Sequence, residues 1–188
     1  MKHGLEYYLS TKTSIEPIQV QKIISLFKRQ TIKKNTTLLS EGEICNELYF
    51  VHSGCIRTYY ITKQGNQKTR YIAFDNSIAT SISSFIPQQQ SFEFVGTLED
   101  SVLYSISHKD FYQLVSDIPQ WEKFYITLLE RAYLYQNKKI EGLVTLTAKQ
   151  RYEKLMTESP VHIQRLSNKI LASYLDISQE TLSRLKSS

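Results

Sequence analysis

The 188-residue sequence has few of the residues on which several protein classes depend. Its two cysteines, Cys45 and Cys55, are too few for a disulfide scaffold or an iron–sulfur cluster, and no CxxC pair accompanies an HxxxH motif for zinc. We expect two free thiols packed as small apolar groups, with a regulatory thiol pair as the alternative. The histidines are scattered, at His3, His52, His108 and His162. No metal site is therefore predicted.

Long apolar runs are also absent. No stretch approaches the roughly 18 apolar residues of a membrane-spanning helix. Residues 1–6 lack the apolar region of a secretory signal. Hydrophobic residues still make up 41% of the chain and charged residues 22%, which is enough apolar material for a core. We therefore expect a soluble, cytoplasmic protein of one or two domains that does not contact a membrane.

The surplus of positive charge is modest and unevenly distributed. Lys and Arg number 23 against 18 Asp and Glu, which gives a formal net charge of +5. Residues 144–188 hold seven basic and four acidic side chains, a net +3, whereas residues 1–143 hold sixteen and fourteen, a net +2. The positive charge density is therefore highest at the C-terminal end, which is where a nucleic-acid partner would bind.

The N-terminal part of the chain has the pattern of a short helix followed by many strands. Apolar residues in segment 15–27 have helical spacing, with Ser14 as the expected N-cap and Pro17 near the start. From residue 33 onward, short alternating or β-branched runs recur between turns that contain Gly42, Gly54 and Gly65. The expected strands are 36–39, 47–52, 55–61, 68–74, 93–98 and 102–106. Many short strands at this spacing predict an all-β jelly roll or small barrel.

After Pro119 the apolar period changes from two to about 3.5 residues, as in a coiled coil. The residues that repeat at this period are Ile126, Leu129, Tyr133, Gln136, Ile140 and Leu143. A second apolar face consists of Trp121, Phe124, Leu128 and Tyr135. A helix that is apolar on two faces must cover two partners. We expect the second face to pack on the β domain and the heptad seam to pair with a second copy of the chain. The alternative is a core helix within one chain.

The C-terminal segment carries the most specific pattern. Thr147 and Gln150 have the spacing of a capping box that opens a helix through about residue 158, before Pro160. A twenty-residue unit then starts at Asn168, after the expected N-cap Ser167. Its apolar positions four, eight, ten, fifteen and eighteen are Leu171, Leu175, Ile177, Leu182 and Leu185. Its small fifth residue is Ala172 and its ninth, at the turn, is Asp176, where glycine is usual. This spacing is typical of a helix-turn-helix.

The polar side of this unit predicts contacts with double-stranded DNA. With the apolar residues inside, the last helix presents outward Gln179, Glu180, Ser183, Arg184 and Ser187. In the major groove, Gln pairs with adenine, Arg with guanine and Glu with cytosine. The predicted DNA-binding set is completed by residues suited to positioning phosphates: Ser167, Asn168, Lys169, Ser178, Thr181 and Lys186. The alternative is an ordinary helical hairpin with a solvated polar face.

Signatures of catalysis are missing. No Walker loop, GxSxG elbow or GxGxxG fingerprint occurs in the sequence. A cupin-type metalloenzyme would need closely spaced metal ligands on paired strands, and the scattered histidines form no HxH pair. We therefore expect no enzyme, no metal and no cofactor. A regulator that works through small-molecule or protein contacts, without a DNA function, remains as an alternative.

Several stretches resemble the cyclic-AMP receptor / fumarate-and-nitrate regulator (Crp/Fnr) family of bacterial transcription factors, and together they span essentially the whole chain. Residues 39–57 (LSEGEICNELYFVHSGCIR) look like the family's opening β-roll motif, with Gly42 and Gly54 where that motif places them. Residues 98–101 (LEDS) match the strand that leaves the family's phosphate-binding cassette. Residues 178–184 (SQETLSR) are similar to the family's recognition helix.

The resemblance implies an α+β architecture in three parts. These are a cyclic-nucleotide-binding-like β-roll over residues 1–118, a dimerisation helix over 119–144 and a winged-helix-like helix-turn-helix domain over 145–188. Only residues 161–166 offer a wing strand. The resemblance also implies DNA, a second copy of the chain and RNA polymerase as partners, and a small-molecule effector bound by the β-roll.

The positions that hold cyclic AMP in the family carry other residues here. Family members bind its ribose with a Glu that follows Gly, and its phosphate with an Arg in a Pro-Arg-Ser-Ala-like run. The corresponding stretches are 78–81 (IATS) and 90–93 (QSFE), which place Thr80 near the Glu position and Ser91 at the Arg position. Because a phosphate without a bidentate Arg loses its main charge-assisted contact, we expect an unidentified effector and not cyclic AMP.

The expected effector pocket is rich in hydroxyl groups. The residues that would line it are Thr80, Ser81, Ser83, Ser84, Ser91, Arg57 and Arg70. Arg57 and Arg70 would replace the missing Arg only if their strands direct them inward. The alternative is a serine-rich loop that binds no ligand.

Overall fold

The computed structural model describes residues 4–187. Residues 1–3 and 188, and with them His3 and part of the N-terminal segment 1–6, lie outside the described residues. The described chain forms two compact units. The first contains residues 4–60 and 70–128, and the second contains residues 61–69 and 129–187.

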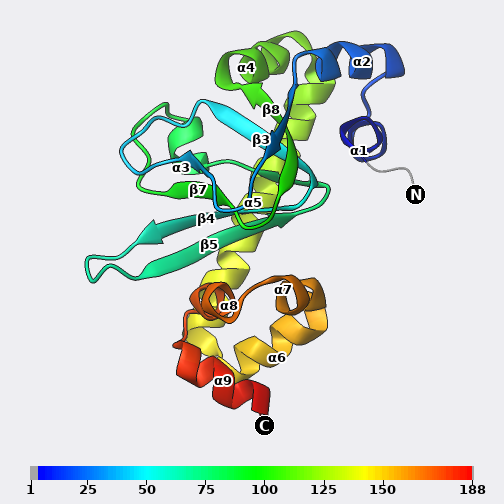
Figure 1. Ribbon diagram of the computed structural model, residues 1–188. Coiled ribbons are helices and arrows are strands. Elements are labelled where there is room, and N and C mark those ends of the chain that lie inside the picture. The colour runs from blue at the N-terminus through cyan, green and yellow to red at the C-terminus, as the bar shows by residue number, and fades with distance from the viewer. Residues whose placement is uncertain (1–3, 188) are drawn as a thin grey trace. The chain divides into compact units, whose positions relative to one another are not determined.

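The first unit is built on two antiparallel four-stranded sheets (Figure 1). One sheet has the order β1-β8-β3-β6 and the other has the order β2-β7-β4-β5. The strands are β1 (Lys28–Ile32), β2 (Thr37–Leu39), β3 (Glu47–Ser53), β4 (Cys55–Ile61), β5 (Gln67–Phe74), β6 (Ser77–Ala79), β7 (Phe94–Thr97) and β8 (Ser101–Ser107). The six predicted strands are confirmed within one or two residues at each end. The prediction missed β1 and the short β6.

The helices of the first unit were only partly foreseen. They are α1 (Leu5–Lys12), α2 (Pro17–Ser25), α3 (Ile82–Phe85), α4 (His108–Asp117) and the first part of α5 (Pro119–Thr145). The helix predicted over 15–27 is the shorter α2, and its N-cap is Glu16, because Pro17 takes the first helical position; Ser14 as the cap was wrong. The prediction also missed α1, α3 and α4.

The core of the first unit lies between the sheets and beneath the helices. Phe50 of β3, Ile56 of β4 and Leu103 of β8 have no solvent-exposed side-chain surface. From α5, Trp121 and Phe124 join this core, so the prediction that this helix face packs on the β domain is confirmed for those two residues. Cys45 and Cys55 are free and buried, as expected.

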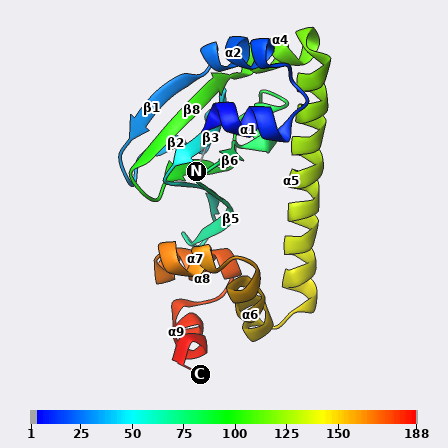
Figure 2. The same cartoon turned by 90° about the vertical axis from the view of Figure 1, so that its right-hand side faces the viewer.

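Helix α5 is one uninterrupted helix of 27 residues (Figure 2). Its seam residues Ile126, Tyr133 and Ile140 are 48%, 67% and 57% exposed in the single chain. These exposures contradict the alternative of a core helix buried within one chain. Tyr135 was assigned to the face packed on the β domain, and that assignment was wrong. Its hydroxyl hydrogen-bonds to that of Tyr174 in the second unit, at 2.9 Å.

The second unit gathers four short helices, the end of α5 and the tip of the β4–β5 hairpin. The short helices are α6 (Ala148–Glu158), α7 (Pro160–Arg165), α8 (Asn168–Leu175) and α9 (Gln179–Ser187). The capping box of Thr147 and Gln150 is present at the start of α6. Segment 161–166, which was predicted as the only source of a wing strand, is helical in α7 because Pro160 starts a helical turn. Within the described part of the C-terminal segment, no wing strand is present.

Among residues 4–187, no helix combines the length and the apolar character that crossing a membrane requires.

Gly54 gives a test of how tightly the turn between β3 and β4 packs. Its φ is +105°, and an added Cβ would lie 2.7 Å from the Cα of Ser101. We expect Gly54→Ala to lower the free energy of unfolding by about 2–4 kcal/mol, from backbone strain plus overpacking. The matched control is Gly65→Ala, whose φ is +79° but whose Cβ would meet nothing within 4 Å, at a cost of about 1 kcal/mol. Urea denaturation measures both, and equal losses would contradict the packing argument.

Candidate nucleic-acid interface and sensor cluster

Helices α8 and α9 form the predicted helix-turn-helix. Leu171, Ala172, Leu175 and Leu182 are at most 5% exposed, so these inward positions of the pattern are confirmed. Ile177 and Leu185, which were also predicted to face inward, are half-buried. Helix α6 contacts α8, and its residues Tyr152 and Leu155 are buried as well. Ala172 is where the pattern requires a small residue, because a larger side chain would separate two helices that cross closely.

The turn between α8 and α9 depends on Asp176. This residue ends α8 in the left-handed conformation, with φ 56° and ψ 47°. Asp and Asn tolerate this region better than most non-glycine residues, which is why Asp176 can stand where glycine is usual. The amide of Ile177 donates to the carbonyl of Ala172 at 3.1 Å and closes the end of α8.

The outer face of α9 carries the residues that were predicted to read bases. Gln179, Glu180, Ser183 and Arg184 are all exposed. The Ser178 hydroxyl accepts from the amide of Thr181 at 3.1 Å, so Ser178 caps the helix. A hydrogen bond with Ser178, above all, lowers the pKa of Glu180 below its usual value.

The predicted phosphate-positioning residues lie at the ends of the same two helices. Ser167 accepts from the amide of Ile170 and caps α8. Asn168 accepts a hydrogen bond from Lys186 at 2.6 Å, which joins the start of α8 to the last turn of α9. Lys169 is exposed. The structure therefore brings the predicted DNA-binding set onto one pair of helices.

In the first unit, three of the predicted effector residues gather around a carboxylate that the sequence reasoning missed. Glu93 is 1% exposed, and its Oε1 accepts from Arg70 Nη1 at 2.7 Å. Its Oε2 accepts from the Ser81 hydroxyl at 2.8 Å. Ser91 donates to the carbonyl of Glu93 at 2.9 Å and lies 3.1 Å from the Ser81 hydroxyl. We call Arg70, Ser81, Ser91 and Glu93 the sensor cluster.

The remaining predicted effector residues lie elsewhere. Thr80 donates to the carbonyl of Glu47 at 3.0 Å and also contacts the Cys45 thiol at 3.2 Å. Ser84 is buried and accepts from the amide of Cys45 at 2.9 Å. Ser83 is exposed, and its hydroxyl lies 3.5 Å from that of Ser81, at the edge of the sensor cluster. The hydroxyls of Thr80 and Ser84 therefore bond to other groups, and only the Ser83 hydroxyl touches the cluster.

Arg57 is directed inward and is 8% exposed. Its guanidinium lies 3.8 Å from the centre of the Tyr59 ring. Burial lowers the pKa of Arg57, and Tyr59 opposes that shift. The stacking on Tyr59 holds Arg57 along its own strand.

The sequence pattern gave a misleading signal for Glu93. It stands between Phe92 and Phe94 in a predicted strand, and such alternation predicts that the acidic residue faces solvent. In the structure Phe92 is 50% exposed and Glu93 is 1% exposed. A charged residue in such a run is buried only when it has a partner. The identity of that partner, Arg70, has no local signal because the two residues are 23 positions apart.

Metal binding finds no support in this part of the molecule. Throughout residues 4–187, no group of three or more His, Cys, Asp or Glu side chains is placed to hold a metal ion.

Comparison with known proteins identifies the first unit and the fold. Residues 29–117 match the cyclic nucleotide-binding domain family. No curated protein matches the sequence significantly. Several solved structures are similar over most of their length.

A protein from Eubacterium rectale assigned to the Crp/Fnr family of transcriptional regulators has 20% sequence identity and a TM-score of 0.75, over 95% of this chain and 85% of its own. The c-di-GMP-responsive global regulator CLP of Xanthomonas campestris has 18% identity and a TM-score of 0.74, over 90% and 89%. The catabolite activator protein of Thermus thermophilus has 20% identity and a TM-score of 0.61, over 92% and 82%.

These similar structures are described as regulators. They also confirm the predicted architecture of a β-roll, a long helix and a helical C-terminal part. Residues 29–117 therefore match the model of the cyclic nucleotide-binding domain family, and the chain shares the fold of the solved Crp/Fnr-type structures to which it is similar.

Proposed function

We propose that the protein is a sequence-specific, DNA-binding transcriptional regulator that acts in the cytoplasm as a homodimer. The observation that carries this proposal is the α8–turn–α9 unit. Its apolar positions are buried, its turn residue Asp176 is left-handed, and its outer face is polar and exposed. RNA polymerase is included as a partner because a transcriptional regulator acts on that enzyme's access to a promoter.

The chemistry of α9 suits base recognition in the major groove. Gln179 and Arg184 are exposed on α9, five positions apart in sequence, and their side chains suit adenine and guanine edges. Arg184 donates to the Thr181 hydroxyl at 3.4 Å, which orients the guanidinium along the helix. The first turns of both helices offer backbone amides and hydroxyls to phosphates, with Ser167 and Lys169 at the start of α8.

The dimer rests on the exposed seam of α5. Ile126, Tyr133, Ile140 and Leu143 are at least 38% exposed and repeat at heptad spacing. An apolar row of this length on a long helix is costly to leave in water. A second copy of α5 has the same spacing and covers it by knobs-into-holes packing.

The sensor cluster argues against cyclic AMP as the effector. A buried carboxylate, Glu93, already holds Arg70, so the guanidinium most suited to a cyclic phosphate is neutralised within the protein. A second anion beside Glu93 would be repelled in a site of low dielectric constant. The fold alone does not specify the ligand either, since CLP is described as responsive to c-di-GMP. We therefore expect an effector of another kind, or regulation without one.

The alternative is a β-roll that regulates only through protein or small-molecule contacts. Salt dependence distinguishes the two, because DNA binding through phosphates weakens steeply with salt.

We expect purified protein, without added ligand, to select a pseudo-palindromic DNA motif with half-sites one helical turn apart, about 34 Å. Binding should weaken steeply between two salt concentrations, and adding cyclic AMP should leave the affinity unchanged. On the selected motif, Arg184→Ala should lose roughly 1–3 kcal/mol at one base position, whereas Lys169→Ala should weaken binding to all sequences alike. Fluorescence anisotropy measures the binding affinity for the selected motif, for its single-base variants and for random DNA.

Two outcomes would go against this assignment. Equal losses on specific and random DNA for Arg184→Ala would remove Arg184 from base reading. Failure to select any motif, with weak binding that does not respond to salt, would favour the regulator without a DNA function.

The seam has its own test. Replacing Leu129 and Ile140 together by Lys should give monomers, because buried ammonium groups at facing heptad positions are costly. The control replaces Glu130 and Glu141 by Lys. These two exposed residues directly follow Leu129 and Ile140 in the sequence. Light scattering should show half the mass for the seam variant only. An unchanged mass would overturn the assignment of this face.

Glu93→Ala should destabilise the protein by about 3–5 kcal/mol, because it leaves Arg70 and the Ser81 hydroxyl without their buried partner. Glu41→Ala, at an exposed site, should change stability by less than about 0.5 kcal/mol. Glu93→Gln, which keeps the size but not the charge, should fall between them. Urea denaturation measures all three, and a Glu93→Ala variant as stable as Glu41→Ala would mean that the cluster is not structural.

A further inference from the structure

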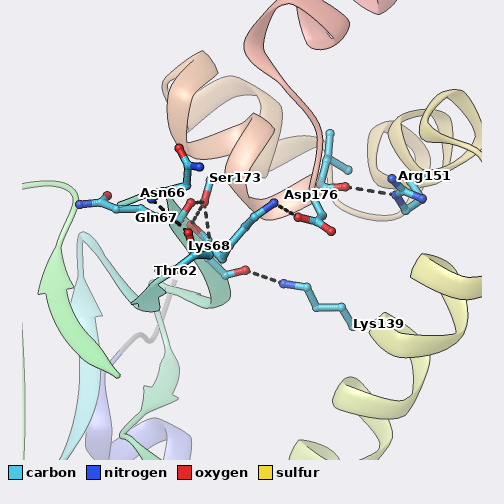
Figure 3. A network of polar contacts seen from close by, with 10 residues as sticks. Thr62, Asn66, Gln67, Lys68, Lys139, Arg151, Ser173 and Asp176 are labelled. Carbon is cyan, nitrogen blue, oxygen red and sulfur yellow. Dashed lines mark hydrogen bonds and ion pairs between the residues drawn. The ribbon is translucent and has the colours of Figure 1, made fainter. Parts of the chain in front are cut away.

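The tip of the β4–β5 hairpin groups with the C-terminal helices and not with the rest of its own sheet. Residues 61–69 and 129–187 make up one compact unit. Figure 3 shows the polar network that joins the hairpin to α8 and α5. The network uses side chains that neither the predicted base contacts nor the α5 seam requires.

Ser173 of α8 is the centre of the network. Its hydroxyl accepts from the amide of Thr69 at 2.8 Å and donates to the carbonyl of Gln67 at 2.9 Å. The Thr69 hydroxyl lies 2.9 Å from the same oxygen, and Thr69 is 4% exposed. One serine therefore bonds to two backbone groups on the edge of the hairpin.

An ion pair fastens the same hairpin to the helix-turn-helix turn. Lys68 binds the carboxylate of Asp176, and the two side chains are 35% and 44% exposed. Asp176 thus combines two properties that glycine cannot combine. It accepts the left-handed backbone of the turn, and it offers a charge to the hairpin.

Lys139 of α5 completes the network from a third element. Its ammonium donates to the carbonyl of Thr69 at 2.7 Å and lies 4.4 Å from the centre of the Tyr174 ring. On the other side of α8, Arg151 donates to the carbonyl of Leu175 at 3.1 Å. The C-terminal end of α8 is therefore held from the hairpin, from α5 and from α6.

We propose that Lys68, Thr69, Ser173 and Asp176 form a hairpin clamp that holds the helix-turn-helix ready for DNA. The contacts of the clamp leave Gln179, Ser183 and Arg184 exposed, so a closed clamp is compatible with DNA binding. Ordering α8 and α9 before they meet DNA reduces the entropy that binding must lose. The effect on DNA rests on the proposed function, whereas the clamp itself does not.

The first arm of the test measures the clamp without DNA. Hydrogen exchange of the Thr69 amide, followed by NMR on the full chain, reports directly on its bond to Ser173. We expect Ser173→Ala to speed exchange about tenfold and Lys68→Ala about threefold. Asp176→Asn removes the charge and keeps the left-handed turn. In the double variant Lys68→Ala/Asp176→Asn, the Thr69 amide should exchange no faster than in the faster of the two single variants.

The matched control is Lys63→Ala, which removes the same charge from an exposed position in the same hairpin. Its Thr69 amide should exchange as in the unchanged protein. Equal Thr69 exchange rates in Lys68→Ala and Lys63→Ala would overturn the ion pair as part of the clamp. So would a rate increase in the double variant equal to the product of the increases in the two single variants.

The second arm measures DNA affinity on the selected motif. Lys68→Ala should bind about three- to tenfold more weakly than Lys63→Ala, although both have lost one positive charge. If the Thr69 amide exchanges faster in Lys68→Ala but the two variants bind DNA with equal affinity, the clamp has no role in DNA binding. If the unchanged protein selects no DNA, the proposed function fails, and the exchange arm still decides whether the clamp exists.

Discussion

Strand β5 depends on the simplest constraint of a β-strand, that consecutive side chains point to opposite sides of the backbone. At the point where β5 leaves the hairpin tip, this alternation gives Thr69 and Arg70 different partners. Thr69 bonds to Ser173 of α8, and Arg70 bonds to the buried Glu93. A single peptide unit therefore belongs both to the sensor cluster and to the clamp on the helix-turn-helix.

The sensor cluster shows how burial changes the chemistry of a binding region. An ionised carboxylate is excluded from the interior unless it is paired, so Glu93 requires Arg70 and the Ser81 hydroxyl. Once that pair has formed, the same arginine has less to offer an external anion. This pairing is the basis of our proposal that the domain does not bind cyclic AMP.

The C-terminal unit is governed by the small size of Ala172 and the left-handed backbone of Asp176. The first permits the close approach of α8 and α9, and the second turns the chain between them. Because the apolar residues of both helices face inward, Gln179 and Arg184 are left on the outside. On α5, Ile126, Tyr133 and Ile140 are likewise left exposed by the described residues of the single chain.

Local patterns in the sequence predicted six strands of the β-roll, the heptad spacing along α5, the capping box of Thr147 and the buried positions Leu171, Leu175 and Leu182 of the helix-turn-helix. All of these depend on periodicity or on residues within a few positions of one another, so the information lies in short windows. The partner of Glu93, the bond between Thr69 and Ser173 and the ion pair of Lys68 with Asp176 could not be found in this way. Those residues are 23, 104 and 108 positions apart, and only the folded chain brings them together. Segment 161–166 shows the same limit at short range. Its β-branched residues suit a strand, but the segment lies in the helix that Pro160 opens. The described C-terminal segment contains no neighbouring strand with which it could pair.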